Sequence, residues 1–228
     1  FAAGDYKFGI EICEDLWVTI PPSSYLSLLG ANIIGNLSAS NELVSKKDYR
    51  LSLIANQSAR CMSSYIYSSA GVHESTTDLL FSGHLVISEN GTILKENNRF
   101  QRENEVITSC IDVFKLNAER LKNLSYRDSS KIVPFKPKNI NFNFKNTKIN
   151  NFDRYIDKHP FVPSNEHERE ERCKEIFNIQ SSALAKRLEH TNLKKAVIGI
   201  SGGLDSTLAL LVIVKTFKLL GIDNSNII

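Results

Sequence analysis

The sequence has few cysteines and no arrangement of them that suits a metal site or a disulfide framework. The four cysteines, Cys13, Cys61, Cys110 and Cys173, lie far apart among 228 residues, with no C-x-x-C pair and no histidine pair beside them. Structural zinc sites and disulfide-dense secreted domains need closely spaced cysteines. The pattern argues against both classes, and it predicts reduced thiols in a cytoplasmic protein.

The sequence also lacks a long apolar run and a block of charge of one sign. No stretch reaches the roughly 20 apolar residues that a membrane-spanning helix needs, and no signal-peptide pattern is evident. The formal net charge is only +3, whereas nucleic-acid-binding proteins concentrate Lys and Arg on one face. We therefore expect neither a membrane nor a nucleic acid as a partner.

The composition that is present is typical of a globular chain with a core. Hydrophobic residues make up 42% and charged residues 23%, over a length that allows one large or two small domains. In the run 136–151, ten of the sixteen residues are Lys or Asn, which is typical of a solvated linker. We predict a first domain at 1–133, a linker at 134–162 and a second domain at 163–228.

The first domain is predicted to alternate strands with helices. Apolar residues, alternating or continuous, predict three strands, at 7–12, 31–37 and 64–70. We expect Phe8, Ile10 and Ile12 of the first strand to point inward. Helical spacing predicts two helices, at 23–29 and 46–62.

Antiparallel strands are predicted to complete this domain. The β-rich runs 84–88 and 92–95 flank Asn90 and Gly91, a pair suited to the positive φ angles of a hairpin turn. A further strand is predicted at 105–113. The predicted fold class is therefore α/β, with a layered sheet.

The second domain is predicted to hold a short strand between two helices. Ser164 is the expected N-cap of a helix whose first turns are rich in Glu. An apolar strand is predicted at 196–200. After a loop at 201–206, a helix is predicted at 207–220, with Gly221 as a suitable C-terminal stop.

The loop Ser-Gly-Gly-Leu-Asp-Ser, residues 201–206, is the sharpest motif. Adjacent glycines let the backbone turn tightly and bring its N–H groups close to an anion. The helix that follows presents unpaired N–H groups and its positive dipole end to the same point. The loop is therefore predicted to bind a polyphosphate. The alternative is a tight strand-to-helix turn in which Asp205 and Ser206 cap the helix.

This loop resembles the pyrophosphate-binding loop of ATP pyrophosphatases, which cleave ATP between its α and β phosphates to form an adenylate. By that resemblance, the ATP-binding residues are Gly199, Ile200, Ser201, Gly202, Gly203, Leu204, Asp205 and Ser206. The resemblance also implies that Asp205 binds the Mg²⁺ that bridges the phosphates.

Cys13 is the centre of the other motif, Glu-Ile-Cys-Glu-Asp-Leu-Trp at 11–17. Neighbouring carboxylates disfavour a thiolate, and most lone cysteines are inert packing residues, so the residue chemistry alone favours an inert thiol. The string resembles the nucleophile segment of nitrilase-superfamily amidases, as do the segments 36–41 and 71–83. In that superfamily cysteine, lysine and glutamate cleave an amide through a thioester.

Both motifs in this order resemble the glutamine-dependent NAD synthetases, as do the segments 159–163, 177–180 and 197–206. The family resemblance implies that the first domain is the C-terminal part of a nitrilase-like αββα layered sheet. It implies that the second is the start of an ATP-pyrophosphatase-like parallel α/β domain. The reaction expected of the family joins two sites. Ammonia from glutamine passes through a tunnel to a second site, where ATP adenylates deamido-NAD and ammonia displaces AMP.

The resemblance assigns roles around Cys13, which would attack the side-chain amide of glutamine. Glu14 would shape the pocket, Ser40 and Lys46 would contact glutamine, and Trp17 would line the pocket. The family's catalytic glutamate and lysine would lie before Phe1, and most of the synthetase domain beyond Ile228. We therefore expect an internal fragment that is inactive alone.

The partners expected of the full-length protein are small-molecule substrates and further copies of itself in a homo-oligomer. Two alternatives stay open: another ATP-pyrophosphatase amidotransferase, or a non-catalytic fragment. Other amidotransferases with this loop generally carry a different glutaminase, so the Cys13 segment argues against the first alternative.

Overall fold

Six strands form one mixed sheet in the first part of the chain, and they follow one another across the sheet in sequence order. The computed structural model describes residues 1–75, 77–134, 136–143 and 152–228, so parts of the predicted linker lie outside the described residues. The described residues form two units, Phe1–Tyr155 and Ile156–Ile228. The domain limits at 133 and 163 stay a prediction.

The sheet of the first unit is parallel at its centre. The strands are β1 (Ala2–Ala3), β2 (Tyr6–Ile12), β3 (Ile33–Ser38), β4 (Ser64–Ser69), β5 (Leu85–Glu89) and β6 (Thr92–Glu96). Strands β2, β3 and β4 pair in parallel, and the other neighbours pair antiparallel. The α/β class, the three strands predicted at 7–12, 31–37 and 64–70, and the hairpin are confirmed.

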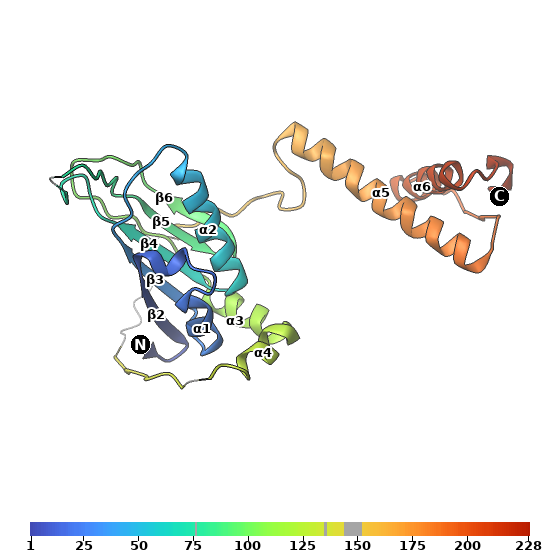
Figure 1. The fold of residues 1–228 in the computed structure, drawn as a ribbon. Helices are drawn as coiled ribbons and strands as arrows, with labels where there is room; N and C mark the ends of the chain where they lie inside the picture. The colour runs from blue at the N-terminus through green and yellow to red at the C-terminus, as the bar shows by residue number, and fades with distance from the viewer. Residues whose placement is uncertain (76, 135, 144–151) are drawn as a thin grey trace. The chain divides into compact units, whose positions relative to one another are not determined.

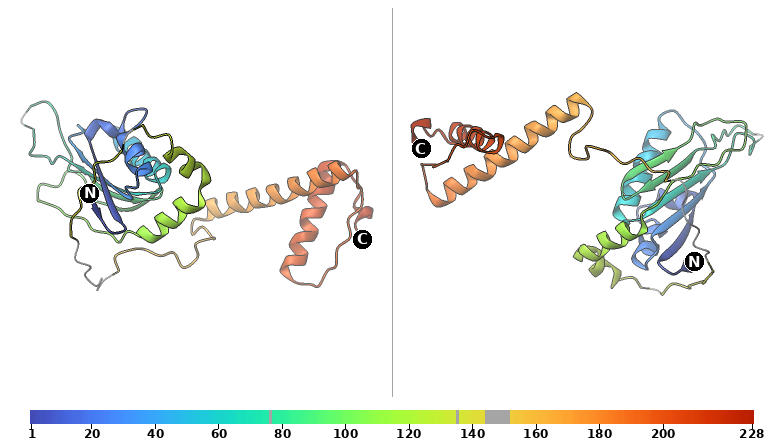
Figure 2. Two further views of the ribbon diagram at one scale, coloured as in Figure 1. Left: turned by 90° about the horizontal axis from the view of Figure 1, so that it is seen from below. Right: turned by 180° about the vertical axis from the view of Figure 1, so that it is seen from behind.

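Two helices connect the parallel strands, as expected for right-handed crossovers. They are α1 (Pro22–Leu28) and α2 (Lys46–Arg60), close to the predicted limits. Both lie across the same face of the sheet, and the view from behind shows strands with no helix over them (Figures 1 and 2). Beneath the two helices the core holds Leu16, Ala31, Ile34, Ile54, Tyr65, Tyr67 and Val86.

The inward face predicted for β2 is wrong. Ile10 and Ile12 are 52% and 64% exposed, whereas Gly9 and Glu11 are buried under the helices. Gly9 is needed there because an added Cβ would lie 3.0 Å from the Leu26 side chain of α1. The alternation gave the correct period, but a period does not say which face of a sheet the helices cover.

We expect Ile54→Ala to be strongly destabilising, because Ile54 of α2 is fully buried in this core. Removing such a side chain leaves a cavity and should lower the free energy of unfolding by about 2–5 kcal/mol. Urea unfolding followed by circular dichroism measures the change. The matched control is Ser52→Ala on the exposed side of the same helix, which should stay within about 0.5 kcal/mol. Equal effects of the two variants would contradict this packing.

The strand predicted at 105–113 does not form. The segment is irregular until α3 (Val113–Lys122) begins, with Asp112 as its N-cap. The backbone N–H of Cys110 donates to the Asp153 carbonyl, and that of Asp112 donates to the Glu89 carboxylate, 2.7 Å away. These acceptors are a loop carbonyl and a side-chain carboxylate, and not the backbone of a neighbouring strand, so the alternating residues do not make a strand.

Helix α3 and the short α4 (Leu124–Ser130), which the sequence did not predict, close the amino-terminal edge of the parallel strands. The buried Arg120 guanidinium of α3 donates to the carbonyls of Ala31 and Cys61 at 2.7 and 2.9 Å, and to that of Met62 at 3.0 Å. The arginine therefore satisfies carbonyls in the turns that precede β3 and β4.

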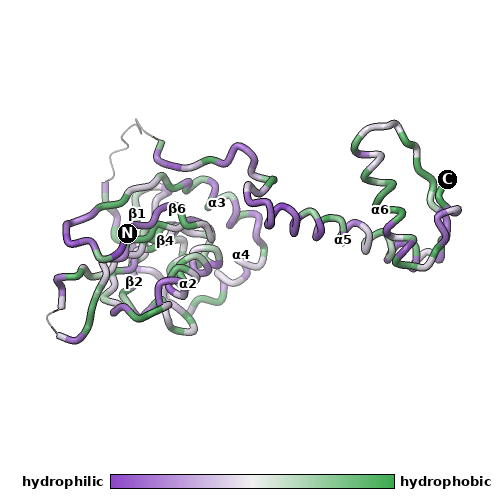
Figure 3. Tube along the Cα trace, turned by 90° about the horizontal axis from the view of Figure 1, so that it is seen from above, coloured by the Kyte–Doolittle hydropathy of each residue, from purple (hydrophilic) through white to green (hydrophobic). Residues whose placement is uncertain are grey.

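The second unit is a helical pair, α5 (Glu166–Thr191) and α6 (Leu204–Leu220), followed by a short 3-10 turn at Asn224–Asn226. Leu188, Ile213 and Phe217 form the buried centre of the contact. Figure 3 shows α6 as mostly hydrophobic, whereas the first turns of α5 are hydrophilic.

Three predictions for this unit need correction. The N-cap of α5 is Asn165, whose side chain accepts from two backbone N–H groups, and not Ser164. The predicted strand at 196–200 makes only an isolated bridge, between Ala196 and Ile227. Helix α6 begins at Leu204, three residues earlier than predicted, so it includes Asp205.

Candidate functional site

Cys13 lies on a sharp turn at the carboxyl end of β2. The 3-10 helix η1 (Cys13–Leu16) begins where the strand ends, and Cys13 has a φ of +49°, which non-glycine residues rarely adopt. The Asp15 carboxylate accepts the backbone N–H of Ile12 at 2.8 Å, and this contact fixes the turn. The thiol is therefore presented at the carboxyl edge of the parallel strands, where α/β proteins bind ligands.

One cavity brings all five predicted glutaminase residues together. Its volume is about 360 Å³, and its lining residues are Cys13, Glu14, Trp17, Ala39, Ser40, Asn41 and Lys46. They come from η1 and its C-cap Trp17, from the loop after β3 and from the first turn of α2. A volume of this size suits a small polar molecule.

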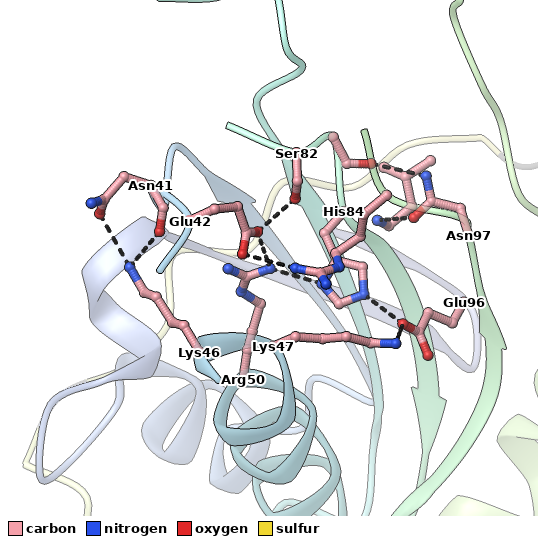
Figure 4. Close-up of polar contacts among 12 residues, drawn as sticks. Asn41, Glu42, Lys46, Lys47, Arg50, Ser82, His84, Glu96 and Asn97 are labelled. Carbon is pink, nitrogen blue, oxygen red and sulfur yellow. Dashed lines mark hydrogen bonds and ion pairs between the residues drawn. The ribbon is translucent and has the colours of Figure 1, made fainter. Parts of the chain in front are cut away.

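Lys46 is held in place on the cavity wall. Its Nζ donates to the backbone carbonyl of Asn41 at 2.7 Å and to the Asn41 side chain at 3.1 Å (Figure 4). It also lies 5.4 Å from the centre of the Trp17 ring. Burial, and next the charge of Arg50, lower the pKa of Lys46 below its usual value. The ammonium is thus positioned in advance to meet an anionic group of a ligand.

A buried carboxylate, Glu42, anchors the loop that connects Asn41 to Lys46. It accepts from Arg50 at 2.8 Å, from Ser82 at 2.6 Å and from Arg99 at 3.0 Å. Burial raises the pKa of Glu42. Hydrogen bonds from Arg50 and Ser82 and the charges of Arg50 and Arg99 outweigh burial, so the pKa lies below its usual value. The carboxylate therefore stays charged, and it ties the cavity wall to α2 and to the loops that precede β5 and follow β6.

His84 continues this network towards β6. Its Nδ1 lies 2.8 Å from Arg50 Nη1, and its Nε2 lies 3.1 Å from the Glu96 carboxylate, which also pairs with Lys47 at 2.8 Å (Figure 4). Because the arginine can only donate, Nδ1 accepts and Nε2 carries the proton in the neutral ring. Burial, and next the charge of Arg50, lower the pKa of His84 below 6.5 despite Glu96.

We expect this histidine to make the first unit less stable in acid. His84 binds a proton in the unfolded chain below about pH 6.5 but stays neutral in the folded chain until a lower pH. Its contribution is therefore present above pH 6.5 and lost as the pH falls through the folded pKa. The loss is at most about 1.4 kcal/mol per pH unit for one proton.

Urea unfolding of the wild type and of His84→Gln between pH 7 and 5 measures this contribution. The wild type should lose more stability over this range than the variant. Equal slopes would show that His84 is protonated at the same pH in both states.

The second candidate site is the loop 201–206, in the other unit. Gly202 has a φ of +84°, which favours glycine, and Gly203 is the N-cap of α6 without a capping side chain. Ser206 and Thr207 turn their hydroxyls back to the Gly203 carbonyl, at 3.1 and 2.9 Å. The alternative in which Asp205 and Ser206 cap the helix is therefore wrong.

The loop faces solvent. Residues 199–205 are exposed, including Asp205 in the first turn of α6, and Ser206 is half-buried. The structure thus keeps the predicted phosphate-binding residues in one continuous stretch of the second unit, whereas Cys13 and its cavity belong to the first. Among the described residues, no three His, Cys, Asp or Glu side chains are grouped so that they could hold a metal ion. In the same parts of the chain, no helix has the length and apolarity to cross a membrane.

Sequence comparison identifies relatives along the whole chain. The glutamine-dependent NAD(+) synthetase of Mycobacterium leprae is 36% identical over 238 residues, which cover 100% of this chain and 35% of the relative. That of Thermotoga maritima is 31% identical over 90% of this chain and 33% of the relative. The chain is a homologue of glutamine-dependent NAD(+) synthetases. It spans about a third of the length of these relatives.

The chain was also compared with protein-family models and with solved structures. No protein-family model matches the chain. Among solved structures, the glutamine-dependent NAD+ synthetase from Acinetobacter baumannii in complex with ADP has a TM-score of 0.43 and 20% identity, over 100% of this chain and 33% of that chain. The carbon–nitrogen hydrolase from Helicobacter pylori G27 has a TM-score of 0.44 and 17% identity, over 52% of this chain and 44% of that chain.

Proposed function

We propose that the protein that carries this chain is a glutamine-hydrolysing NAD⁺ synthase, a carbon–nitrogen ligase. The observation that carries the proposal is the single cavity lined by Cys13, Glu14, Trp17, Ser40 and Lys46, in a chain that is homologous to these synthetases throughout. Residues 1–133 would belong to the glutaminase, 134–162 to the linker and 163–228 to the start of the synthetase. We place the protein in the cytoplasm, as a homo-oligomer.

In the proposed glutaminase, the Cys13 sulfur attacks the side-chain amide carbon of glutamine. The C–N bond breaks, ammonia leaves and a thioester forms, which water then hydrolyses to glutamate. Lys46 and Ser40 on the cavity wall would hold the amino-acid end of glutamine. By family resemblance, a glutamate and a lysine of the full-length protein that are not among these 228 residues would provide the proton transfers.

In the proposed synthetase, the loop 201–206 holds the phosphates of ATP while deamido-NAD is adenylated. Ammonia then displaces AMP, and the products are NAD⁺, AMP and pyrophosphate. The unpaired N–H groups at the start of α6 and the exposed loop fit a polyphosphate. The exposed Asp205 carboxylate fits Mg²⁺, which takes one or two carboxylates together with phosphate oxygens. When bound, Mg²⁺ would offset the negative charge of the phosphates.

An isotope-transfer experiment tests the proposal. The full-length protein is incubated with ATP, Mg²⁺, deamido-NAD and glutamine labelled with ¹⁵N at the side-chain amide. We expect the label in the carboxamide of NAD⁺, with one AMP and one pyrophosphate per NAD⁺. Unlabelled NAD⁺, or release of ADP in place of AMP, would contradict the proposal.

A further inference from the structure

A chain of buried hydrogen bonds lies beneath the turn that carries Cys13. The Asn36 side-chain amide donates to the Cys13 carbonyl at 3.3 Å and to the Tyr65 hydroxyl at 3.1 Å. That hydroxyl donates to the Glu11 carboxylate, which also accepts the backbone N–H of Ser23 at 2.7 Å. Glu11 is 2% exposed, and Asn36 and Tyr65 are fully buried. These hydrogen bonds thus connect the first turn of α1, at Ser23, to the backbone of Cys13.

The sheet register places these three side chains next to one another. Glu11 on β2 is the direct neighbour of Asn36 on β3, and Tyr65 on β4 is paired with Ile34, two residues before Asn36. All three point to the helix-covered face, since alternate residues share a face. Each of the parallel strands β2, β3 and β4 therefore contributes one side chain to the network. The network ends at the carbonyl oxygen of Cys13.

The Glu11 carboxylate is buried, and burial of a charged group costs free energy unless donors satisfy it. Glu11 occupies an inward position of β2 where an apolar side chain would avoid the cost of burying a charge. It is held by donors from Ser23 and Tyr65. Burial, and next the charge of Glu11, raise the pKa of Tyr65, so this hydroxyl remains a donor. The network is therefore fixed in one direction, from the Asn36 amide through the tyrosine to the carboxylate.

The backbone at the other end of this chain is strained. Cys13 has a left-handed φ of +49° without being glycine, and such conformations persist only where the surroundings hold them in place. The Asn36 contact to the Cys13 carbonyl holds one side of the turn, and the Asp15 contact to Ile12 holds the other. The conformation directs the thiol to the cavity that Ser40 and Lys46 also line.

We propose that Glu11, Tyr65 and Asn36 are positioning residues, which hold the backbone of Cys13 so that its thiol faces glutamine. The inference rests on the proposed glutaminase function and deepens it. None of the three touches the reacting atoms, so their effect passes through the Cys13 main chain. A misplacement of about 1 Å at a reacting group can cost about 100-fold in rate.

Two tyrosines of one strand provide the matched test. Tyr65→Phe removes the bridging hydroxyl. Tyr67→Phe removes a hydroxyl that is equally buried, on the same face of β4, but has no hydrogen-bond partner among the described residues. Both changes keep the ring, including the contact of the Arg50 guanidinium with Tyr67. If the Tyr65 hydroxyl served only general packing, the two variants would have the same activity.

The full-length protein is assayed with glutamine and, separately, with ammonia. For Tyr65→Phe we expect kcat/KM for glutamine to fall at least about tenfold, mainly in kcat, because a misdirected thiol slows the chemical step. Ammonia-dependent synthesis should be unchanged. Alkylation of Cys13 by iodoacetamide, followed by mass spectrometry with the exposed Cys173 as internal reference, should also slow. Tyr67→Phe should stay within about twofold in all three measurements.

Equal behaviour of the two tyrosine variants would overturn the inference, as would a parallel loss of ammonia-dependent synthesis. Cys13→Ala, assayed alongside, separates this failure from that of the proposed function. If Cys13→Ala loses glutamine use while Tyr65→Phe keeps it, only the positioning role is wrong. If Cys13→Ala keeps glutamine use, the glutaminase assignment itself is wrong. Should Tyr65→Phe not fold, Asn36→Ala replaces it under the same criteria.

Discussion

The variant Cys13→Ala of the full-length protein is expected to make no NAD⁺ from glutamine while it still makes NAD⁺ from ammonia. The thiol is the proposed nucleophile in the cavity, and without it no thioester can form. Loss of a nucleophile costs more than about 10³-fold in rate. Ammonia-dependent synthesis should persist, because the ATP loop lies in the other unit and its chemistry needs no thiol.

Steady-state rates with each nitrogen donor measure the two activities in the same preparation. The control is Cys173→Ala, since Cys173 is an exposed cysteine of α5 and should be neutral for both donors. Glutamine-dependent synthesis by Cys13→Ala at more than a few per cent of the wild-type rate would refute the nucleophile assignment. Loss of both activities together would point to a folding defect, which a melting curve detects.

The variant Asp205→Asn is expected to lose NAD⁺ synthesis from ammonia by at least about 100-fold, a size typical of removing a charge-stabilising group from an active site. Asp205 lies exposed in the first turn of α6, beside a loop proposed to hold phosphates. Asparagine keeps the shape but removes the charge that would ligate Mg²⁺. Stability should change little, since a negative charge at a helix N-terminus contributes about 0.3–1 kcal/mol.

Glutamine hydrolysis should continue in Asp205→Asn, because it takes place at Cys13. Titration of Mg²⁺ in the ammonia assay distinguishes a lost metal ligand from a general defect, since weaker binding raises the concentration needed for half-maximal rate. Glu189→Gln removes an exposed charge from α5 of the same unit and serves as the control. Near-normal synthesis by Asp205→Asn at ordinary Mg²⁺ would show that Asp205 is not a metal ligand.

Local patterns were sufficient to predict most of the first sheet. The strands and crossover helices follow from apolar periodicity, and the hairpin follows from the turn residues Asn90 and Gly91, both of which have positive φ. The segment 105–113 has the same alternation, but its backbone N–H groups donate to the Asp153 carbonyl and the Glu89 carboxylate and not to a neighbouring strand. Alternation of apolar residues shows that a segment could form a strand with one apolar face. It does not show whether another strand is available to pair with it.

The cavity residues were predicted by family resemblance and not by residue chemistry, which alone favoured an inert Cys13. The polar networks around the cavity could not be predicted either way. Glu11 meets a tyrosine 54 positions later, and Arg50 meets a histidine 34 positions later. Buried polar side chains of this kind interrupt the apolar pattern of their elements, so their partners become visible only when strands are placed side by side.

The order of the strands has a consequence for how the chain folds during synthesis. Each strand from β2 to β6 pairs with the strand made just before it, so none has to wait for a later segment to supply its neighbour. The sheet can therefore extend by one strand at a time as the chain leaves the ribosome, with a single connecting segment to close at each step. Arg120 follows all six strands in the chain and binds carbonyls at the edge of strands already formed, so its contacts should form after the sheet.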